Sequence, residues 1–257
     1  MNPLASLWAL DPDVAYLNHG SFGACPSAVL AHQAELRRRI EREPFRFFAR
    51  DLEGLLDRAR EEAAGVFGAS PEDLAFVPNA TTGINTVLRS LDLGPGDEIL
   101  TTDHLYNACR TALEFTAGRT GARIVAARVP FPLAAEGEIV EAVLDEVTDR
   151  TRFALLDHVT SATALVFPIG ALVARLRSAG IETIVDGAHA PGMVPLDLDR
   201  IGAAYYAGNA HKWLCAPKGA AFLHVRRDRQ EGLHPLSISH GYDAVPPARP
   251  RFRLQFA

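Results

Sequence analysis

The chain has 257 residues, 48% of them hydrophobic and 22% charged, and its formal net charge at pH 7 is −5. This composition is typical of a globular chain with an ample core, and its scattered charges offer no basic face for nucleic acid. No run approaches the ~18 apolar residues of a membrane helix, and the first residues lack a secretory signal pattern. Three widely separated cysteines, Cys25, Cys109 and Cys215, favour reduced thiols and a cytoplasmic location.

Along the chain, strand-like apolar runs alternate with amphipathic helical stretches, which predicts an α/β layered domain. The predicted helices are Ser27–Arg42, Arg50–Phe67, Thr82–Leu91, Tyr106–Ala117, Ile139–Val147 and Pro168–Ala179. The predicted strands are Leu74–Val77, Glu98–Thr101, Arg123–Arg128, Phe153–His158, Thr183–Asp186, Ala203–Ala207 and Ala220–Val225. We therefore expect a mostly parallel, seven-stranded sheet between helices, with ligands at the carboxyl ends of its strands.

Two features precede the first predicted strand. The arginines at 37–39 fall in a helical pattern with acids close by, which favours a solvated helix face. The segment Pro44–Phe48 is dense in aromatic residues. It is either a hydrophobic plug or an exposed aromatic loop that reaches a neighbouring subunit.

The strongest chemical signal is a pair of later segments, 182–192 and 205–214. In the first, an apolar run ends at Asp186, and His189 follows three positions on. In the second, two aromatic residues lead into a turn and then Lys212, about 26 residues after the acid. A lysine amine can bond covalently to an aldehyde on a pyridine ring, and a carboxylate can keep the ring nitrogen protonated. The ordered pair favours a pyridoxal phosphate site.

Four segments carry a resemblance to a known family: LNHGSFGACP (17–26), NATTGIN (79–85), VDGAHAPG (185–192) and HKWLCAPKG (211–219). They resemble the fold-type I pyridoxal-phosphate enzymes of the class V aminotransferase group, relatives of cysteine desulfurase, and within it the isopenicillin N epimerase-like branch. The resemblance covers nearly the whole chain in order. It implies the large domain of a fold-type I transferase, an amino-acid-like substrate and a homodimer.

The phosphate of this cofactor is expected at residues 79–83, which follow a strand and open a helix. Backbone N–H groups, hydroxyls and the helix dipole suit an anion there; the alternative is that Thr81 or Thr82 only caps the helix. The resemblance assigns the phosphate contacts to five residues, Ala80, Thr81, Thr82, Asn209 and His211. Asn209 replaces the serine of many relatives.

The cofactor ring needs a planar partner, and both His104 and Tyr106 are available in the loop after the second strand. The resemblance selects Tyr106, which can also hold or move a proton near the substrate, and leaves His104 as a structural loop residue. It further places Ser161 and His189 near the ring oxygen. The expected catalytic residues are thus Lys212, Asp186 and Tyr106. Asp157 and His158 lack a spaced third ligand, so no metal is expected.

The substrate side is expected at the turn after Asn18, where the resemblance brings His19 or Ser21 to the mouth of the site. In the resembled enzymes the chain continues into a smaller domain, which supplies an arginine for the substrate carboxylate. We therefore expect an N-terminal segment at 1–16, a cofactor-binding large domain at 17–230, and at 231–257 the start of a truncated small domain. Arg251 and Arg253 are poor substitutes for that arginine. A naturally compact chain is the alternative.

The expected reaction is at the α-carbon of an amino acid or a peptide-like amine. Lys212 can take the proton on one face, and epimerisation needs a second base, Tyr106 or His19. Cysteine desulfurase, carbon–sulfur lyase and class V aminotransferase activities are alternatives. So is a binding protein built on an inactive copy of the fold. A nucleotide-binding protein is disfavoured, because the chain has no G-x-G-x-x-G junction and no P-loop.

Overall fold

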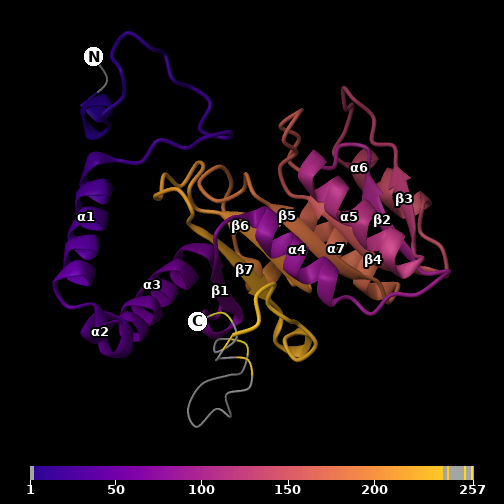
Figure 1. The fold of residues 1–257 in the computed structure, drawn as a ribbon. Coiled ribbons are helices and arrows are strands. Elements are labelled where there is room, and N and C mark those ends of the chain that lie inside the picture. Colours follow the sequence, from indigo (N-terminus) through magenta and orange to yellow (C-terminus); the bar gives the residue numbers. More distant parts are fainter. Residues whose placement is uncertain (1–2, 240–241, 243–251, 253–255, 257) are drawn as a thin grey trace.

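A computed structural model gives the fold and describes residues 3–239, 242, 252 and 256 (Figure 1). The described strands form one sheet in the order β1-β7-β6-β5-β4-β2-β3. They are β1 Leu74–Val77, β2 Glu98–Thr102, β3 Arg123–Ala127, β4 Thr151–Asp157, β5 Glu182–Gly187, β6 Tyr205–Asn209 and β7 Ala221–Val225. Strands β3, β2, β4, β5 and β6 are parallel, and β7 is antiparallel to both β6 and β1. The predicted mostly parallel, seven-stranded α/β sheet is confirmed.

Helices cover both faces of this sheet. They are α1 Ser27–Arg42, α2 Pro44–Arg46, α3 Leu52–Phe67, α4 Ala80–Ser90, α5 Asn107–Thr120, α6 Gly137–Asp145, α7 Ile169–Ser178 and α8 Leu198–Ile201. One apolar cluster joins α4 and α5 to the sheet, and the other joins α3, α6, α7 and α8 to the opposite face. Each of the six predicted helices is present, with ends that differ by at most a few residues. The short helices α2 and α8 were not predicted.

Consecutive strand residues serve opposite faces, because side chains alternate across a strand. In β4, Leu155 packs with α4 and α5, whereas Ala154 and Leu156 pack with the other helices. In β5, Ile184 packs with α4 and α5, and Val185 packs with the helices on the opposite face. Burial on both faces explains why these strands read as continuous apolar runs. Among the described residues, no helix is both long and apolar enough to cross a bilayer.

The direction of the strands sets the position of the site. Because β1 pairs with β7 and β7 with β6, both antiparallel, β1 runs the same way as β6. The carboxyl ends of β1, β2, β4, β5 and β6 therefore open at one edge of the sheet. Asp157, Asp186 and Asn209 end β4, β5 and β6 or lie one residue before the end. Ligands of parallel sheets collect at this edge.

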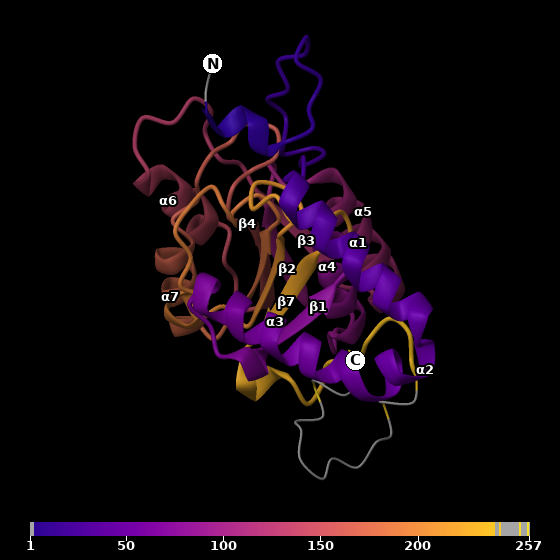
Figure 2. The same cartoon turned by 90° about the vertical axis from the view of Figure 1, so that its left-hand side faces the viewer.

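The N-terminal helices extend from the β1 side of the sheet, as Figures 1 and 2 show. Pro44–Phe48 is not the loop that its aromatic density suggested. Pro44 occupies the first turn of α2, where its fixed φ suits a helix, and Phe47–Asp51 continues as a π-helical turn. Phe47 is buried, whereas Phe45 and Phe48 are 79% and 57% exposed. Phe47 thus fits the alternative of a hydrophobic plug, and Phe45 and Phe48 fit the alternative of an exposed aromatic surface.

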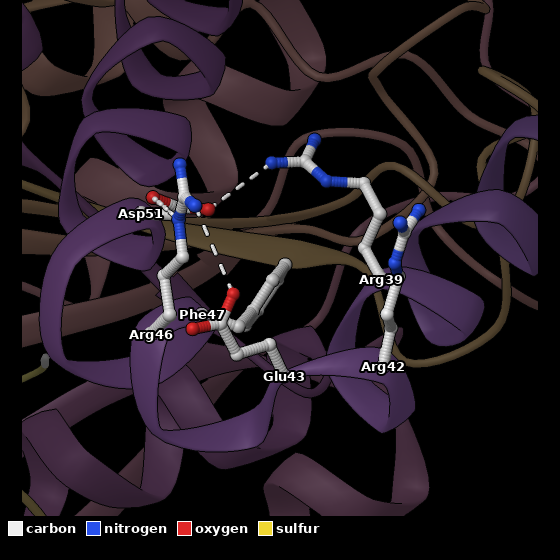
Figure 3. Close-up of a pocket in the computed structure, with 6 residues that line it drawn as sticks. All are labelled: Arg39, Arg42, Glu43, Arg46, Phe47 and Asp51. Carbon is white, nitrogen blue, oxygen red and sulfur yellow. Dashed lines mark hydrogen bonds and ion pairs between the residues drawn. The ribbon is translucent and has the colours of Figure 1, made fainter.

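A cavity of about 270 Å³ lies between α1 and this turn, lined by Arg39, Arg42, Glu43, Arg46, Phe47 and Asp51 (Figure 3). Arg39 pairs with Asp51 at 3.4 Å, and Arg46 with Glu43 at 3.7 Å. The arginines are exposed, so these pairs are largely hydrated. The expected solvated face of α1 is confirmed, and the cavity holds no buried ionisable group with which to do acid–base chemistry.

Candidate active site

A second cavity, of about 290 Å³, lies at the carboxyl edge of the sheet. Its lining comes from six separate stretches of the chain: Gly20, Ser21, Phe22, Thr81, Tyr106, Ser161, Asp186, Ala188, Asn209 and Lys212. Seven of these are residues that the sequence singled out, namely Ser21, Thr81, Tyr106, Ser161, Asp186, Asn209 and Lys212. The volume is close to the lower end of the range of about 300–1,000 Å³ that small-molecule sites occupy.

Lys212 lies in the turn that follows β6, half-buried at the cavity. Its Nζ is 3.1 Å from Nε2 of His189 and 5.9 Å from the centre of the Tyr106 ring. Burial lowers the pKa of Lys212, while the negative charge of Asp186 opposes this shift. A lowered pKa increases the fraction of neutral amine, which is the nucleophilic form.

Asp186 is buried near the end of β5, and both of its carboxyl oxygens have partners. Oδ1 accepts the N–H of Ala188 at 3.0 Å, and Oδ2 accepts the thiol of Cys109 at 3.0 Å. Burial raises the pKa of Asp186, although these two hydrogen bonds and Lys212 work against the rise. The two bonds fix the direction in which the carboxyl group faces. Sequence reasoning did not assign Cys109 any part in the site.

Asp157 is a second buried carboxyl group, to which the sequence analysis assigned no role in the site. It lies directly opposite Asp186 in the β4–β5 register and is 2% exposed. Burial, and after it the charge of Asp186, raise the pKa of Asp157 well above its ordinary value. The backbone N–H of Tyr106 donates to this carboxyl group, but Oδ2 has no hydrogen-bond partner. Burial and the neighbouring charge of Asp186 therefore both favour the protonated form of Asp157.

The start of α4 forms another wall of the cavity. Asn79 caps the helix by accepting the N–H of Thr82 at 2.7 Å, so the alternative that Thr81 or Thr82 is the cap is wrong. The N–H of Ala80 donates to Oδ1 of Asn209 at 2.8 Å, which ties the end of β6 to this helix. No helical carbonyl is available to the N–H of Thr81, which lies between the two. Thr81 itself lines the cavity.

Five predicted residues are absent from the lining of this cavity, namely Ala80, Thr82, His189, His211 and His19. Thr82 donates its hydroxyl to Asn79 at 3.0 Å. His211 uses Nδ1–H for the carbonyl of Ala220 at 2.8 Å, and burial lowers its pKa, so it could donate to a phosphate only with a protonated ring. His19 lines a separate cavity of about 240 Å³ with Trp8, Leu10, Trp213 and Cys215.

Two other expectations concern histidine and arginine residues. His104 bonds Oγ1 of Thr163 through Nδ1 at 2.9 Å and does not line the cavity, in agreement with the expected structural hydrogen bond. Arg251 and Arg253 lie outside the described residues. Nothing in the described structure therefore bears on their contact with a substrate.

The glycine-rich turn of residues 19–23 has a packing reason. A Cβ on Gly23 would lie 2.1 Å from the carbonyl oxygen of His211 and 2.5 Å from that of Lys212. Only glycine lets this turn rest against the backbone that carries the lysine. The turn therefore brings Ser21 to the cavity.

One group of potential metal ligands occurs in the described part of the chain: Asp73, Asp199 and His224. It lies at the opposite edge of the sheet and includes neither Asp157 nor His158. Oδ1 of Asp73 already accepts hydrogen bonds from Arg227 and Gln230, both at 2.7 Å. Its charge is thereby compensated, and the absence of a metal from the cofactor site stays a prediction.

Lys212 and the buried Asp186 thus share one cavity at the carboxyl edge of a mostly parallel α/β sheet. The family is shown by sequence comparison. The sequence model of the family Aminotransferase class-V matches residues 35–246, so the chain belongs to the class-V aminotransferase family.

The similar proteins include enzymes of two kinds. The chain is 40% identical to isopenicillin N epimerase of Streptomyces clavuligerus over 95% of its own length, and 34% identical to a probable chloroplastic L-cysteine desulfhydrase of Arabidopsis thaliana over 90%. It spans 62% and 53% of those relatives.

Solved structures agree with this membership. The cystine C–S lyase C-DES, in complex with cysteine persulfide, matches with a TM-score of 0.82 at 25% identity, covering 95% of this chain and 67% of that one. A variant of the lyase with glycine covalently linked to its PLP cofactor matches with a TM-score of 0.85 at 25% identity, covering 96% and 67%.

Proposed function

We propose that the chain is the cofactor-binding part of a pyridoxal phosphate enzyme that acts at the α-carbon of an amino acid or peptide-like amine, with epimerisation ahead of carbon–sulfur cleavage. The observation that carries the proposal is that Lys212 and Asp186 share one cavity. The epimerase and desulfhydrase relatives, and the lyase with a PLP-linked ligand, support the same chemistry. Because the chain spans 62% of the epimerase, the complete activity needs the full-length protein for its test.

The chemistry of the donor set fits this cofactor. Thr81 at the start of α4 offers an N–H, a hydroxyl and the positive end of a helix dipole to a phosphate. The amide of Asn209 adds an N–H₂ donor beside it, because its oxygen is engaged with Ala80. Asp186 suits a pyridinium nitrogen, and Tyr106 supplies a planar ring at the cavity. Ser161 and His189 are the proposed partners of the ring oxygen, and Thr82 and His211 support the phosphate end.

Bound pyridoxal phosphate supplies an electron sink that acidifies the Cα–H of an attached amino acid. Asp186 would pair with the protonated ring nitrogen, and the bonds from Ala188 and Cys109 fix the direction of its carboxylate. The neutral amine of Lys212 takes the Cα proton on one face. The hydroxyl of Tyr106 is the proposed proton carrier for the other face. It is preferred over His19, which lines a different cavity.

The covalent assignment can be tested cleanly because the chain contains two lysines, Lys212 and Lys218. The chain is loaded with pyridoxal phosphate, reduced with borohydride and mapped by peptide mass spectrometry. We expect the label on Lys212, its loss in Lys212→Ala, and its retention in the matched control Lys218→Ala. A label on Lys218, or none on either lysine, would remove the assignment.

The reaction is tested on the full-length protein with a panel of amino acids and cysteine derivatives in deuterated water. Deuterium at Cα with inverted configuration supports epimerisation. Release of sulfide or pyruvate favours the desulfhydrase or lyase alternative, which the relatives of those names make the second candidate. Conversion to a keto acid, with the cofactor left in its amine form, would point to transamination instead.

Domains and assembly are part of the proposal. Residues 17–230 act as the cofactor-binding domain, preceded by a segment at 1–16 and followed by the start of a small domain at 231–257. A homodimer is supported by exposed apolar residues near the start of the chain, such as Leu17 at 81%, Phe22 at 77% and Phe45 at 79%. If light scattering of the full-length protein shows a monomer, the proposed homodimer is wrong. A cytoplasmic location remains a prediction from the sequence.

A further inference from the structure

Trp213 follows Lys212 in the chain and makes a directional contact with His189. Its indole Nε1 lies 3.2 Å from Nδ1 of His189. An indole nitrogen can only donate a hydrogen bond, so Nδ1 must present a lone pair. The contact therefore specifies which nitrogen of the imidazole is without a proton.

Packing holds this pair of rings in place. A Cβ on Gly20 would lie 2.9 Å from the Trp213 ring and 3.1 Å from Cε1 of His189. A Cβ on Gly192, whose φ is +86°, would lie 2.6 Å from the backbone carbonyl carbon of Trp213. The chain thus approaches both rings closely at Gly20 and the backbone of Trp213 closely at Gly192.

The imidazole of His189 is neutral at pH 7. Burial, and then the charge of Lys212, lower the pKa of His189 to about 4. A neutral imidazole carries one N–H, and with Nδ1 accepting from Trp213 that hydrogen must be on Nε2. Nε2 lies 3.1 Å from Nζ of Lys212. An ammonium group has only N–H donors and would oppose this N–H, whereas a neutral amine can accept from it.

Other groups around Lys212 act in the opposite direction. The negative charge of Asp186 favours the ammonium form, and so does the face of the Tyr106 ring 5.9 Å away. Burial is the largest effect and favours the neutral amine, but it is not directional. The contact with His189 is the one interaction among these that distinguishes the two forms of the lysine by hydrogen-bond geometry.

We propose that Trp213 is a positioning residue that fixes the proton of His189 on Nε2, so that His189 donates a hydrogen bond to the neutral amine of Lys212 and keeps it nucleophilic. The inference rests on the proposed role of Lys212 and deepens it. It assigns Trp213 a function through another residue rather than through contact with a substrate. The conservative variant is Trp213→Phe, which removes the N–H and keeps an aromatic ring.

The first test measures the tautomer directly in the cofactor-free chain. The protein is labelled with ¹⁵N-histidine, long-range ¹H–¹⁵N spectra are recorded at pH 7–8, and the signal of His189 is assigned by its loss in His189→Gln. We expect the Nε2–H tautomer in the wild type and a mixture of tautomers in Trp213→Phe. The matched control is Trp8→Phe, because the other tryptophan of the chain donates its Nε1–H to the carbonyl of Ala24 at 3.2 Å.

The second test measures the reactivity of Lys212 without the cofactor, by competitive acetylation over a range of pH followed by peptide mapping, with Lys218 as the internal reference. Loss of one neutral hydrogen bond corresponds to about a fivefold change in an equilibrium. We therefore expect Trp213→Phe to raise the apparent pKa of Lys212 by about half to one unit, with no shift in Trp8→Phe.

The outcomes separate this inference from the proposed function. An Nδ1–H tautomer or a protonated ring in the wild type overturns the inference, and so does a Trp213→Phe variant whose Lys212 titrates as in the wild type. An Nε2–H tautomer with the expected shift, but without a reducible cofactor adduct on Lys212, would refute the proposed function and leave the proton arrangement standing.

Discussion

The acidic side chains at the two edges of the sheet differ in whether they have arginine partners. At the amino edge, the buried Glu98 and the half-buried Glu182 both have arginine partners: Glu98 is 3.2 Å from Arg123 and 3.1 Å from Arg150, and Glu182 is 2.9 Å from Arg226. At the carboxyl edge, the buried acids Asp157 and Asp186 have no arginine within ion-pair distance among the described residues. Strand β5 thus begins with a carboxylate that has an arginine partner and carries Asp186, which has none in the described part of the chain, near its end.

This difference separates structural acids from acids available for chemistry. An arginine pair satisfies a carboxylate and leaves it little reason to bind a ligand. The buried Asp186 accepts hydrogen bonds only from a thiol and a backbone N–H, which are both neutral. A pyridinium nitrogen would give it a positively charged partner. The contrast predicts that substitutions at one edge change stability, and at the other change chemistry.

The largest effect is expected for Asp186→Ala in the full-length enzyme. Removing a preorganised charge from the reacting group costs about 10²–10³ in rate, so α-proton exchange in deuterated water should fall by that factor. The borohydride-reducible adduct on Lys212 should persist, because the lysine does not need the acid to bond to an aldehyde. Near-normal exchange would show that Asp186 does not act on the cofactor ring.

At the amino edge, Glu98→Ala should reduce stability and spare the chemistry. Glu98 is 1% exposed, and its Oε2 also accepts the hydroxyl of Thr148 at 2.6 Å. The two arginines are exposed and become hydrated when the acid is lost, so we expect a loss of about 2 kcal/mol in the free energy of unfolding by urea. Formation of the Lys212 adduct per folded molecule should not change. If Glu98→Ala instead lowers adduct formation without lowering stability, the distinction between structural acids at the amino edge and chemical acids at the carboxyl edge is wrong.

A smaller, pH-dependent effect is expected for Asp157→Asn in the cofactor-free chain. The folded protein holds the proton of Asp157 above the ordinary pKa of 3.8, so it binds more protons than the unfolded chain, and wild-type stability falls as the pH rises through this window. The amide cannot ionise, and its oxygen can still accept from Tyr106. The variant should therefore gain stability relative to the wild type as the pH rises from 4 to 8 in urea titrations. A constant difference across this range would contradict the raised pKa.

Part of the site was predictable because it depends on the ends of strands. A buried parallel strand reads as an apolar run, and the polar residue that ends it faces the carboxyl edge; Asp186 was found in this way, whereas Asn209 was assigned through the family resemblance. Cys109 could not be found, because its contact with Asp186 spans 77 positions and depends on which face α5 turns to the sheet. The contact of Trp213 with His189 depends on a glycine approach that no spacing encodes. The π-helical turn at 47–51 likewise has no periodic signal.

The smallest effect is expected at the cavity of Figure 3, which resembles neither edge of the sheet. Arg46 is 61% exposed and lies 3.7 Å from Glu43 and 3.9 Å from Asp51. Exposed pairs of this kind contribute at most about 0.5–1 kcal/mol, because water screens the charges and ordering the side chains costs entropy. Arg46→Ala should therefore shift the urea midpoint only slightly and leave the Lys212 adduct intact, with Arg38→Ala, which breaks the exposed pair with Glu35, as the matched control. A loss of adduct in Arg46→Ala but not in Arg38→Ala would mean that arginine outside the sheet supplies a charge to the site, and the division between structural and chemical charges would have to include the N-terminal helices.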